Sequence, residues 1–258
     1  PVSVKALEQA ITLNGIAIDF NLTALRLGRL FAHDPEKANT LLPESMIESE
    51  NMTLDELIEH RSKHLTDYQN KAWADRFLAT VSKTRKVEQV LGLQSEELSY
   101  VVTENLAKLM SYKDEYEVGR LFASADFRQK LDAQFEPGYQ LKFNMAPPLL
   151  SRKHPSTGLP AKREFGNWMM NGFKLLAQLK WLRGTVFDIF GYSAERRHER
   201  ELISEYESMI DHKLTTLSAK NLDETIQIAR LPEQIRGFGH VKQNALAQYQ
   251  RQRAQLTD

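Results

Sequence analysis

Apolar side chains recur three, four or seven residues apart through most of the 258-residue sequence, and this spacing places them along one face of an α-helix. Helix-start residues precede several of these segments. Thr53 and Glu56 have the spacing of a capping box, Ser193 precedes a long apolar repeat, and Asn221 precedes a shorter one. The pattern predicts a mainly α, multi-helix fold.

One segment has a period of two instead. From Tyr139 to Met145 apolar residues alternate with polar ones, as in a half-buried strand, and two prolines follow. Turn residues at 154–158 predict that residues 149–153 fold back on residues 160–165. We therefore expect one small antiparallel β-hairpin.

The helical pattern divides the chain into three parts. We predict a tail helix at residues 1–33, with a split or kink at Asn14-Gly15, and a linker at residues 34–53, where apolar periodicity is lost. Residues 54–258 are predicted to form a helical domain.

Within this domain we expect particular helix bounds. One helix is predicted to continue from Thr53 to Leu91, before Gly92, and another from Asn167 to Leu182, whose apolar side predicts a core helix. The last helix is predicted to begin near Val241.

Net charge limits the classes of partner. Lys and Arg number 34, and Asp and Glu also number 34, so the chain has no overall field that attracts nucleic acid or an anionic membrane. No apolar run approaches the ~20 residues of a membrane span, and the N-terminal residues lack the apolar stretch of a signal peptide. We expect a cytoplasmic protein without nucleic-acid or membrane partners. Since Pro1 leads directly into an amphipathic segment, we also expect a larger parent chain.

Cysteine is absent from the sequence. This chain therefore offers no thiolate for a disulfide, a zinc site, a nucleophile or an iron-sulfur cluster. His60 and His64 stand four residues apart on a predicted helix, the spacing of two metal ligands, but no third ligand accompanies them. We interpret them as surface histidines and predict no metal site.

Positive charge is concentrated in one region. Residues 145–200 contain ten Lys and Arg against four Asp and Glu, with Lys162 and Arg163 on the predicted hairpin. This basic rim either binds a phosphate-bearing ligand or faces the acidic stretch at residues 44–59. The alternative is a solvated or internally paired surface.

A second candidate for anion binding lies near the C-terminus. Gly237 and Gly239 stand between Arg236 and His240, with Lys242 two residues further on, at the predicted start of the last helix. Glycines let backbone amides approach an anion, and a helix N-terminus carries partial positive charge. The spacing matches neither a Walker loop nor a dinucleotide fingerprint, and the alternative is a glycine-mediated turn between helices.

Several strings resemble, in the same order along the chain, the C-terminal domain of the fused indolepyruvate ferredoxin oxidoreductases, over roughly residues 54–245. The strings are MSYKDEYEV at 110–118, APPLL at 146–150, KREFG at 162–166, LRGT at 182–185, FD at 187–188, FGY at 190–192 and LPEQIRGFGHVK at 231–242. Residues 5–28, with AITLNG at 10–15, resemble the tail of the preceding gamma-type domain of that family.

The resemblance implies a parent oxidoreductase that decarboxylates a 2-oxoacid with thiamine diphosphate and magnesium, passes electrons through iron-sulfur clusters to ferredoxin, and forms an acyl-CoA. This chain lacks cysteines and the family's Gly-Asp-Gly thiamine motif, so we expect the segment to bind no cofactor and to be inactive alone. We expect it to pack against catalytic domains of the parent or partner chains, and to form a homo-oligomer.

Two alternatives remain open. The residues Arg236, Gly237, Gly239, His240, Lys242, Lys162 and Arg163 are candidates for a CoA or acyl-CoA phosphate site. An independent anion- or nucleic-acid-binding module is the second alternative.

Overall fold

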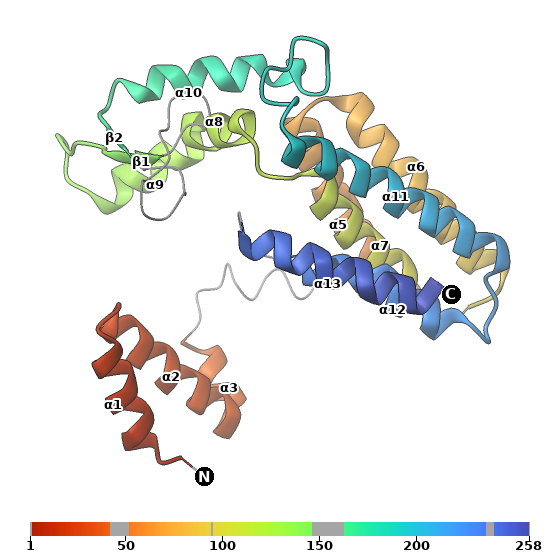
Figure 1. Ribbon diagram of the computed structural model, residues 1–258, viewed down its shortest axis with the longest axis horizontal. Helices are drawn as coiled ribbons and strands as arrows, with labels where there is room; N and C mark the ends of the chain where they lie inside the picture. The colour runs from red at the N-terminus through yellow and green to blue at the C-terminus, as the bar shows by residue number, and fades with distance from the viewer. Residues whose placement is uncertain (1, 42–51, 94, 146–162, 236–239, 258) are drawn as a thin grey trace. The chain divides into compact units, whose positions relative to one another are not determined.

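The computed structural model describes residues 2–41, 52–93, 95–145, 163–235 and 240–257, with the backbone alone at 39, 240–244 and 254–257 (Figure 1). These residues form twelve α-helices, two short 3₁₀ helices and one two-stranded antiparallel sheet. The prediction of a mainly α fold with one small hairpin is confirmed. The chain divides into two units between Thr53 and Leu54, and each is described by itself.

The first unit contains α1 (Val4–Asn14), α2 (Ile18–His33) and α3 (Pro35–Asn39). Gly15 ends α1 in the left-handed conformation, with φ of 71°, and its N–H donates to the carbonyl of Thr12. The predicted split at Asn14-Gly15 is therefore present.

Part of the predicted linker at residues 34–53 is helical. Asp34 accepts a hydrogen bond from the N–H of Lys37 at 3.0 Å, and Pro35 occupies the first turn of α3. This local start signal favours a helical turn even without apolar periodicity. Residues 42–51 lie outside the described residues.

The core of the second unit is a helical bundle. It is built from α5 (Leu54–Tyr68), α6 (Lys71–Val90), α7 (Glu97–Met110), α11 (Ala194–Thr216), α12 (Leu222–Arg230), the 3₁₀ helix η3 (Leu231–Gln234) and α13 (His240–Thr257). Ten residues of α7 are buried, and the seven apolar ones belong to one hydrophobic cluster with Phe77, Ile203 and Tyr206. Apolar burial on α7 thus anchors the bundle.

The prediction of one continuous helix from Thr53 to Leu91 is wrong, because the helix ends at Tyr68 and a second helix begins at Lys71. Asn70 has an extended backbone, and its side-chain oxygen accepts a hydrogen bond from the N–H of Trp73 at 2.9 Å. A capping asparagine therefore starts α6 as a new helix. Ser193 caps α11 as predicted, whereas the side chain of Asn221 bonds to residues before α12 and does not cap it.

A smaller lobe contains α8 (Glu115–Ala123), α9 (Ala125–Gln134), β1 (Phe143–Met145), β2 (Arg163–Phe165), α10 (Met169–Gln178) and the 3₁₀ helix η2 (Leu179–Leu182) (Figure 1). β1 pairs with β2 in antiparallel register, with Phe143 opposite Phe165. Phe122, Phe143 and Phe173 pack with ring centroids 4.9–5.3 Å apart. These aromatic contacts hold the lobe together.

The strand prediction is partly wrong. The strand β1 covers only the last three residues of the predicted 139–145, and it pairs with β2. The predicted partner segment at residues 149–153 lies outside the described residues. Only Phe143 of β1 is buried, so few residues have a packing reason to extend the strand.

The prediction of a core helix at residues 167–182 is also wrong. The α-helix ends at Gln178, Phe173 is its one buried residue, and Trp168 and Leu175 are 64% and 57% exposed. Phe173 faces the aromatic contacts of the lobe, whereas Leu175 points almost oppositely around the helix. Across the described ranges, no helix is both long and apolar enough to span a bilayer.

Candidate functional site

The structure describes few of the residues predicted to bind an anion. Lys162, Arg236, Gly237 and Gly239 lie outside the described residues, and so do the side chains of His240 and Lys242. α13 begins at His240, so a helix does start where the predicted turn ends. Arg163 is exposed on β2, opposite Met145. Arg163 is thus the one candidate whose side chain lies within the described residues, and the anion site stays a prediction.

A different set of polar residues meets inside the second unit. We call it the Arg183 cluster, and it consists of Tyr68, Tyr112, Asp114, Tyr116, Arg183 and Asp188, each 6% exposed or less. Charged residues are rarely buried unless they are paired. The contacts of these residues therefore decide what the cluster can do.

Arg183 lies at the centre of the cluster. Its Nε and Nη2 atoms donate to the two carboxylate oxygens of Asp114 at 2.6 and 2.8 Å, and its Nη1 atom donates to the carbonyl of Tyr68 at 2.6 Å. The guanidinium carbon lies 3.7 Å from the centroid of the Tyr68 ring. All three guanidinium nitrogens are thus engaged, two in a bidentate ion pair and one at the C-terminal end of α5.

Asp114 also begins α8. One of its oxygens accepts a hydrogen bond from the N–H of Glu117 at 2.8 Å, which is the N-cap interaction of this helix. The same carboxylate therefore holds the start of α8 and, through Arg183, the segment after η2. Both carboxylate oxygens of Asp114 thus have hydrogen-bond donors within the chain.

Asp188 organises the loop between η2 and α11. It accepts hydrogen bonds from the hydroxyl of Tyr116 at 3.1 Å and from the N–H groups of Gly184 and Gly191 at 2.8 and 3.0 Å. A Cβ atom on Gly191 would lie 2.7 Å from the carboxyl carbon of Asp188. Only glycine fits at this position while the carboxylate stays in place.

Two tyrosines of the cluster, Tyr68 and Tyr116, act as hydrogen-bond donors. Burial raises the pKa of Tyr68 well above its usual value, and burial also raises the pKa of Tyr112 and Tyr116. Their hydroxyls stay protonated at neutral pH, and that of Tyr68 donates to the carbonyl of Tyr112 at 2.9 Å. The arrangement joins α5, α8 and the segment after η2, and it leaves no general acid or base poised for chemistry.

Other arginines of the basic region have internal partners too. Arg196 lies 3.6 Å from the carboxylate of Glu115, and Arg200 donates to the carbonyl of Gly191 at 2.8 Å. Burial raises the pKa of Glu115. At these positions the structure agrees with the internally paired alternative for the basic region.

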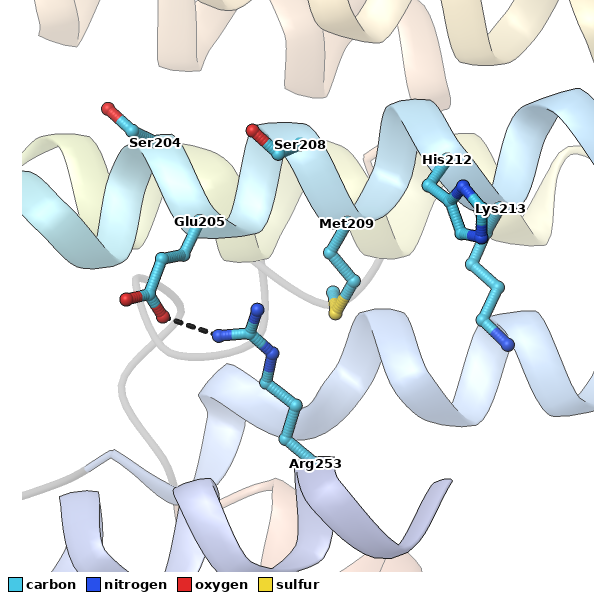
Figure 2. Close-up of a pocket in the computed structure, with 7 residues that line it drawn as sticks. All are labelled: Ser204, Glu205, Ser208, Met209, His212, Lys213 and Arg253. Carbon is cyan, nitrogen blue, oxygen red and sulfur yellow. Dashed lines mark hydrogen bonds and ion pairs between the residues drawn. The ribbon is translucent and has the colours of Figure 1, made fainter. Parts of the chain in front are cut away.

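A groove of about 480 Å³ lies between α11 and α13 (Figure 2). It is lined by Ser204, Glu205, Ser208, Met209, His212, Lys213 and Arg253. Figure 2 shows Arg253 reaching toward Glu205, with which it forms an ion pair, and Lys213 pairs with Glu224 at 3.1 Å. Because carboxylates already contact both cations, the groove is a poor anion site.

His60 and His64 both lie on α5, as predicted. His60 is exposed as expected of a surface histidine, whereas His64 is half-buried, so the surface interpretation is wrong for His64. This burial lowers the pKa of His64, and its imidazole is neutral at neutral pH. Within the described part of the chain, no group of three or more His, Asp and Glu side chains is placed to hold a metal ion.

A comparison with protein families gives one match, which covers residues 54–255 and is described as a family of unknown function, DUF6537. The chain belongs to the DUF6537 family. No similar curated protein and no similar solved structure was found. The match begins where α5 begins, so the DUF6537 region coincides with the second unit and includes both the bundle and the lobe.

Sequence reasoning did not find the Arg183 cluster of the DUF6537 region. Asp114 and Glu117 have capping-box spacing, which is a local signal for the start of α8. The residues around Asp114 do not indicate its ion-pair partner, because Arg183 is 69 residues away in the sequence. Only the tertiary structure reveals the pair.

Proposed function

We propose that this chain is a non-catalytic C-terminal module of a thiamine-diphosphate-dependent 2-oxoacid:ferredoxin oxidoreductase of the indolepyruvate type. In this proposal the module packs against catalytic domains of the parent or its partner chains. The ordered series of strings between residues 110 and 242 supports the choice of parent enzyme.

The Arg183 cluster is the observation that supports a non-catalytic role. Asp114, Arg183 and Asp188 all belong to strings that carry the resemblance, and each of these side chains is buried and hydrogen-bonded within the chain. Catalytic groups need a free lone pair or proton near a substrate, which a fully engaged ion pair does not offer. A role in stabilising the fold therefore suits these residues of the strings better than a role in catalysis.

The implied cofactors do not fit the residues of this chain. Iron-sulfur clusters need cysteine thiolates, and the sequence contains no cysteine. The thiamine pyrophosphate motif is absent as well. The proposal therefore assigns thiamine diphosphate, magnesium and the clusters to other parts of the parent, and no step is derived through them.

The exposed side of α10 supports a packing role. Trp168 directly precedes the helix and Leu175 lies on it, seven residues apart, and they are 64% and 57% exposed. Large apolar side chains in such positions are typical of a surface that contacts another protein. We propose that this side contacts the catalytic part of the enzyme.

The experiment uses an indolepyruvate-type oxidoreductase shortened to lack its own C-terminal module. The chain is added in trans, and binding is measured by calorimetric titration. We expect binding by the native chain, a large loss with Leu175→Asp, and little change with Leu91→Asp, a control at the residue that follows α6, which is 42% exposed.

Circular dichroism confirms that both variants fold. Absence of binding by the native chain contradicts the packing role. Decarboxylation of a 2-oxoacid by the chain alone, with thiamine diphosphate and magnesium, contradicts the non-catalytic role.

A further inference from the structure

The loop between η2 and α11 holds its polar residue inside and its apolar residues outside. Asp188 is 3% exposed, whereas its neighbours Phe187 and Ile189 are 70% and 61% exposed. Folding ordinarily places these residue types the other way round. The inversion has a clear cause, because the carboxylate of Asp188 accepts the hydrogen bonds that close the loop.

Other contacts fix the same loop. The hydroxyl of Tyr192 donates to the carbonyl of Val186 at 2.7 Å, and the Phe190 ring packs edge-on against Tyr116 with centroids 5.4 Å apart. The loop is therefore held on both sides of its exposed residues. The loop backbone that carries the outward side chains therefore loses little conformational entropy when a partner binds.

The outward residues present a large apolar area. Together with Trp181 of η2 we call them the 181–192 surface, which consists of Trp181, Val186, Phe187, Ile189 and Tyr192, all between 60% and 75% exposed. An aromatic side chain has an area of 150–250 Å², so the three rings alone expose roughly 300–500 Å². Two such surfaces together bring roughly 600–1,000 Å² from the rings, close to the ~1,000 Å² expected of a specific interface.

The 181–192 surface carries no exposed charge. Arg183 and Asp188 are the only Lys, Arg, His, Asp or Glu residues in the segment, and they are 4% and 3% exposed. A strongly acidic or basic partner therefore gains no charge complementarity here. The same surface of a second copy can pack against it without placing like charges together. This suits a twofold-symmetric dimer, in which both copies contribute the same patch to the interface.

We propose that the 181–192 surface pairs with the same surface of a second copy of this chain. This pairing is independent of the identity of the parent enzyme. Phe187, next to the buried Asp188, is the central anchor of the pair.

Sedimentation velocity of the purified chain over the micromolar range tests this pairing. We expect a dimer, and Phe187→Asp is expected to weaken it by roughly tenfold or more, the scale of losing an aromatic anchor. The control is Phe20→Asp on α2, where the ring is 74% exposed in the other unit. It is expected to leave the dimer intact.

Because the chain has no cysteine, a single introduced thiol locates the interface directly. Val186→Cys and the control Val90→Cys, at positions 75% and 77% exposed, are each labelled with pyrene. Excimer fluorescence is expected from position 186 and not from position 90.

Three outcomes overturn the proposal. The native chain is monomeric throughout the range, or Phe20→Asp dissociates the dimer while Phe187→Asp does not, or the excimer forms only at position 90. Circular dichroism and urea unfolding establish that every variant is folded.

Discussion

Arg183 and Asp114, which are 69 residues apart in sequence, form a bidentate ion pair with nitrogen–oxygen distances of 2.6 and 2.8 Å. Their side chains are 2% and 3% exposed. Removing one partner of such a pair leaves the other charge buried and uncompensated, which is strongly destabilising. The pair joins the start of α8 to the segment after η2, so it fixes how the lobe connects to the bundle.

Gly119 and Gly172 provide a matched test of how closely α8 and α10 pack. A Cβ atom on Gly119 would lie 2.6 Å from Cβ of Leu176, whereas one on Gly172 would lie 3.6 Å from the sulfur of Met169, an ordinary contact. We expect Gly119→Ala to lower the free energy of unfolding by about 1–3 kcal/mol through overpacking. Gly172→Ala should raise it by about 0.5–1 kcal/mol, because alanine favours the helix.

Urea denaturation of the two glycine variants measures both effects. Equal shifts of the same sign would show that α8 and α10 are not in close contact at Gly119.

Asp188 should control the shape of the loop that carries the 181–192 surface. Asp188→Ala leaves the N–H group of Gly184 and the buried hydroxyl of Tyr116 without their acceptor, and we expect a loss of about 2–4 kcal/mol of stability. The opened loop should be cleaved faster in limited proteolysis. The control is Asp132→Ala, which removes an exposed carboxylate that accepts a hydrogen bond from Tyr139. If both variants resist protease like the native chain, Asp188 does not hold the loop.

Glu88 should make stability depend on pH. It is 1% exposed and accepts hydrogen bonds from the N–H groups of Leu98 and Ser99 at 3.1 Å, which caps α7 from a neighbouring helix. Burial raises the pKa of Glu88 in the folded state. The folded state therefore binds the proton of Glu88 more tightly than the unfolded state does. This proton binding adds to the free energy of unfolding at low pH, and the added stability is lost as pH rises through the folded pKa.

The measurement compares the native chain with Glu88→Gln, which cannot titrate at this position. The unfolding free energy of the native chain minus that of the variant should fall as pH rises from the unfolded pKa of a glutamate through the higher folded value. A difference that is constant or rises with pH contradicts a raised pKa.

Local signals in the sequence predicted much of the fold. Ser193, Gly15 and the alternation up to Met145 each act over a few residues, and the structure has a helix cap, a helix end and a strand at these places. Such features depend on backbone geometry and nearby hydrogen bonds, which adjacent residues specify. The break at Asn70 was missed because apolar spacing continues across it.

Tertiary features could not be predicted in this way. Trp168 and Leu175 have the spacing of a core face, yet they are exposed because the opposite side of α10, with Phe173, packs in the lobe. The partner of Arg183 is fixed by the path of the chain between α8 and η2. The spacing of apolar residues predicts helices and strands, and it does not predict the path of the chain between them.

A double-mutant cycle on Arg183 and Asp114 is the most direct measurement of whether the charged residues of the resembling strings stabilise the fold. Urea unfolding is measured for the native chain, Asp114→Asn, Arg183→Met and the double variant. We expect each single substitution to cost about 3–5 kcal/mol and the double variant to cost well below their sum, because no buried charge is then left unpaired. Single losses below about 1 kcal/mol that simply add would contradict a structural role for the pair.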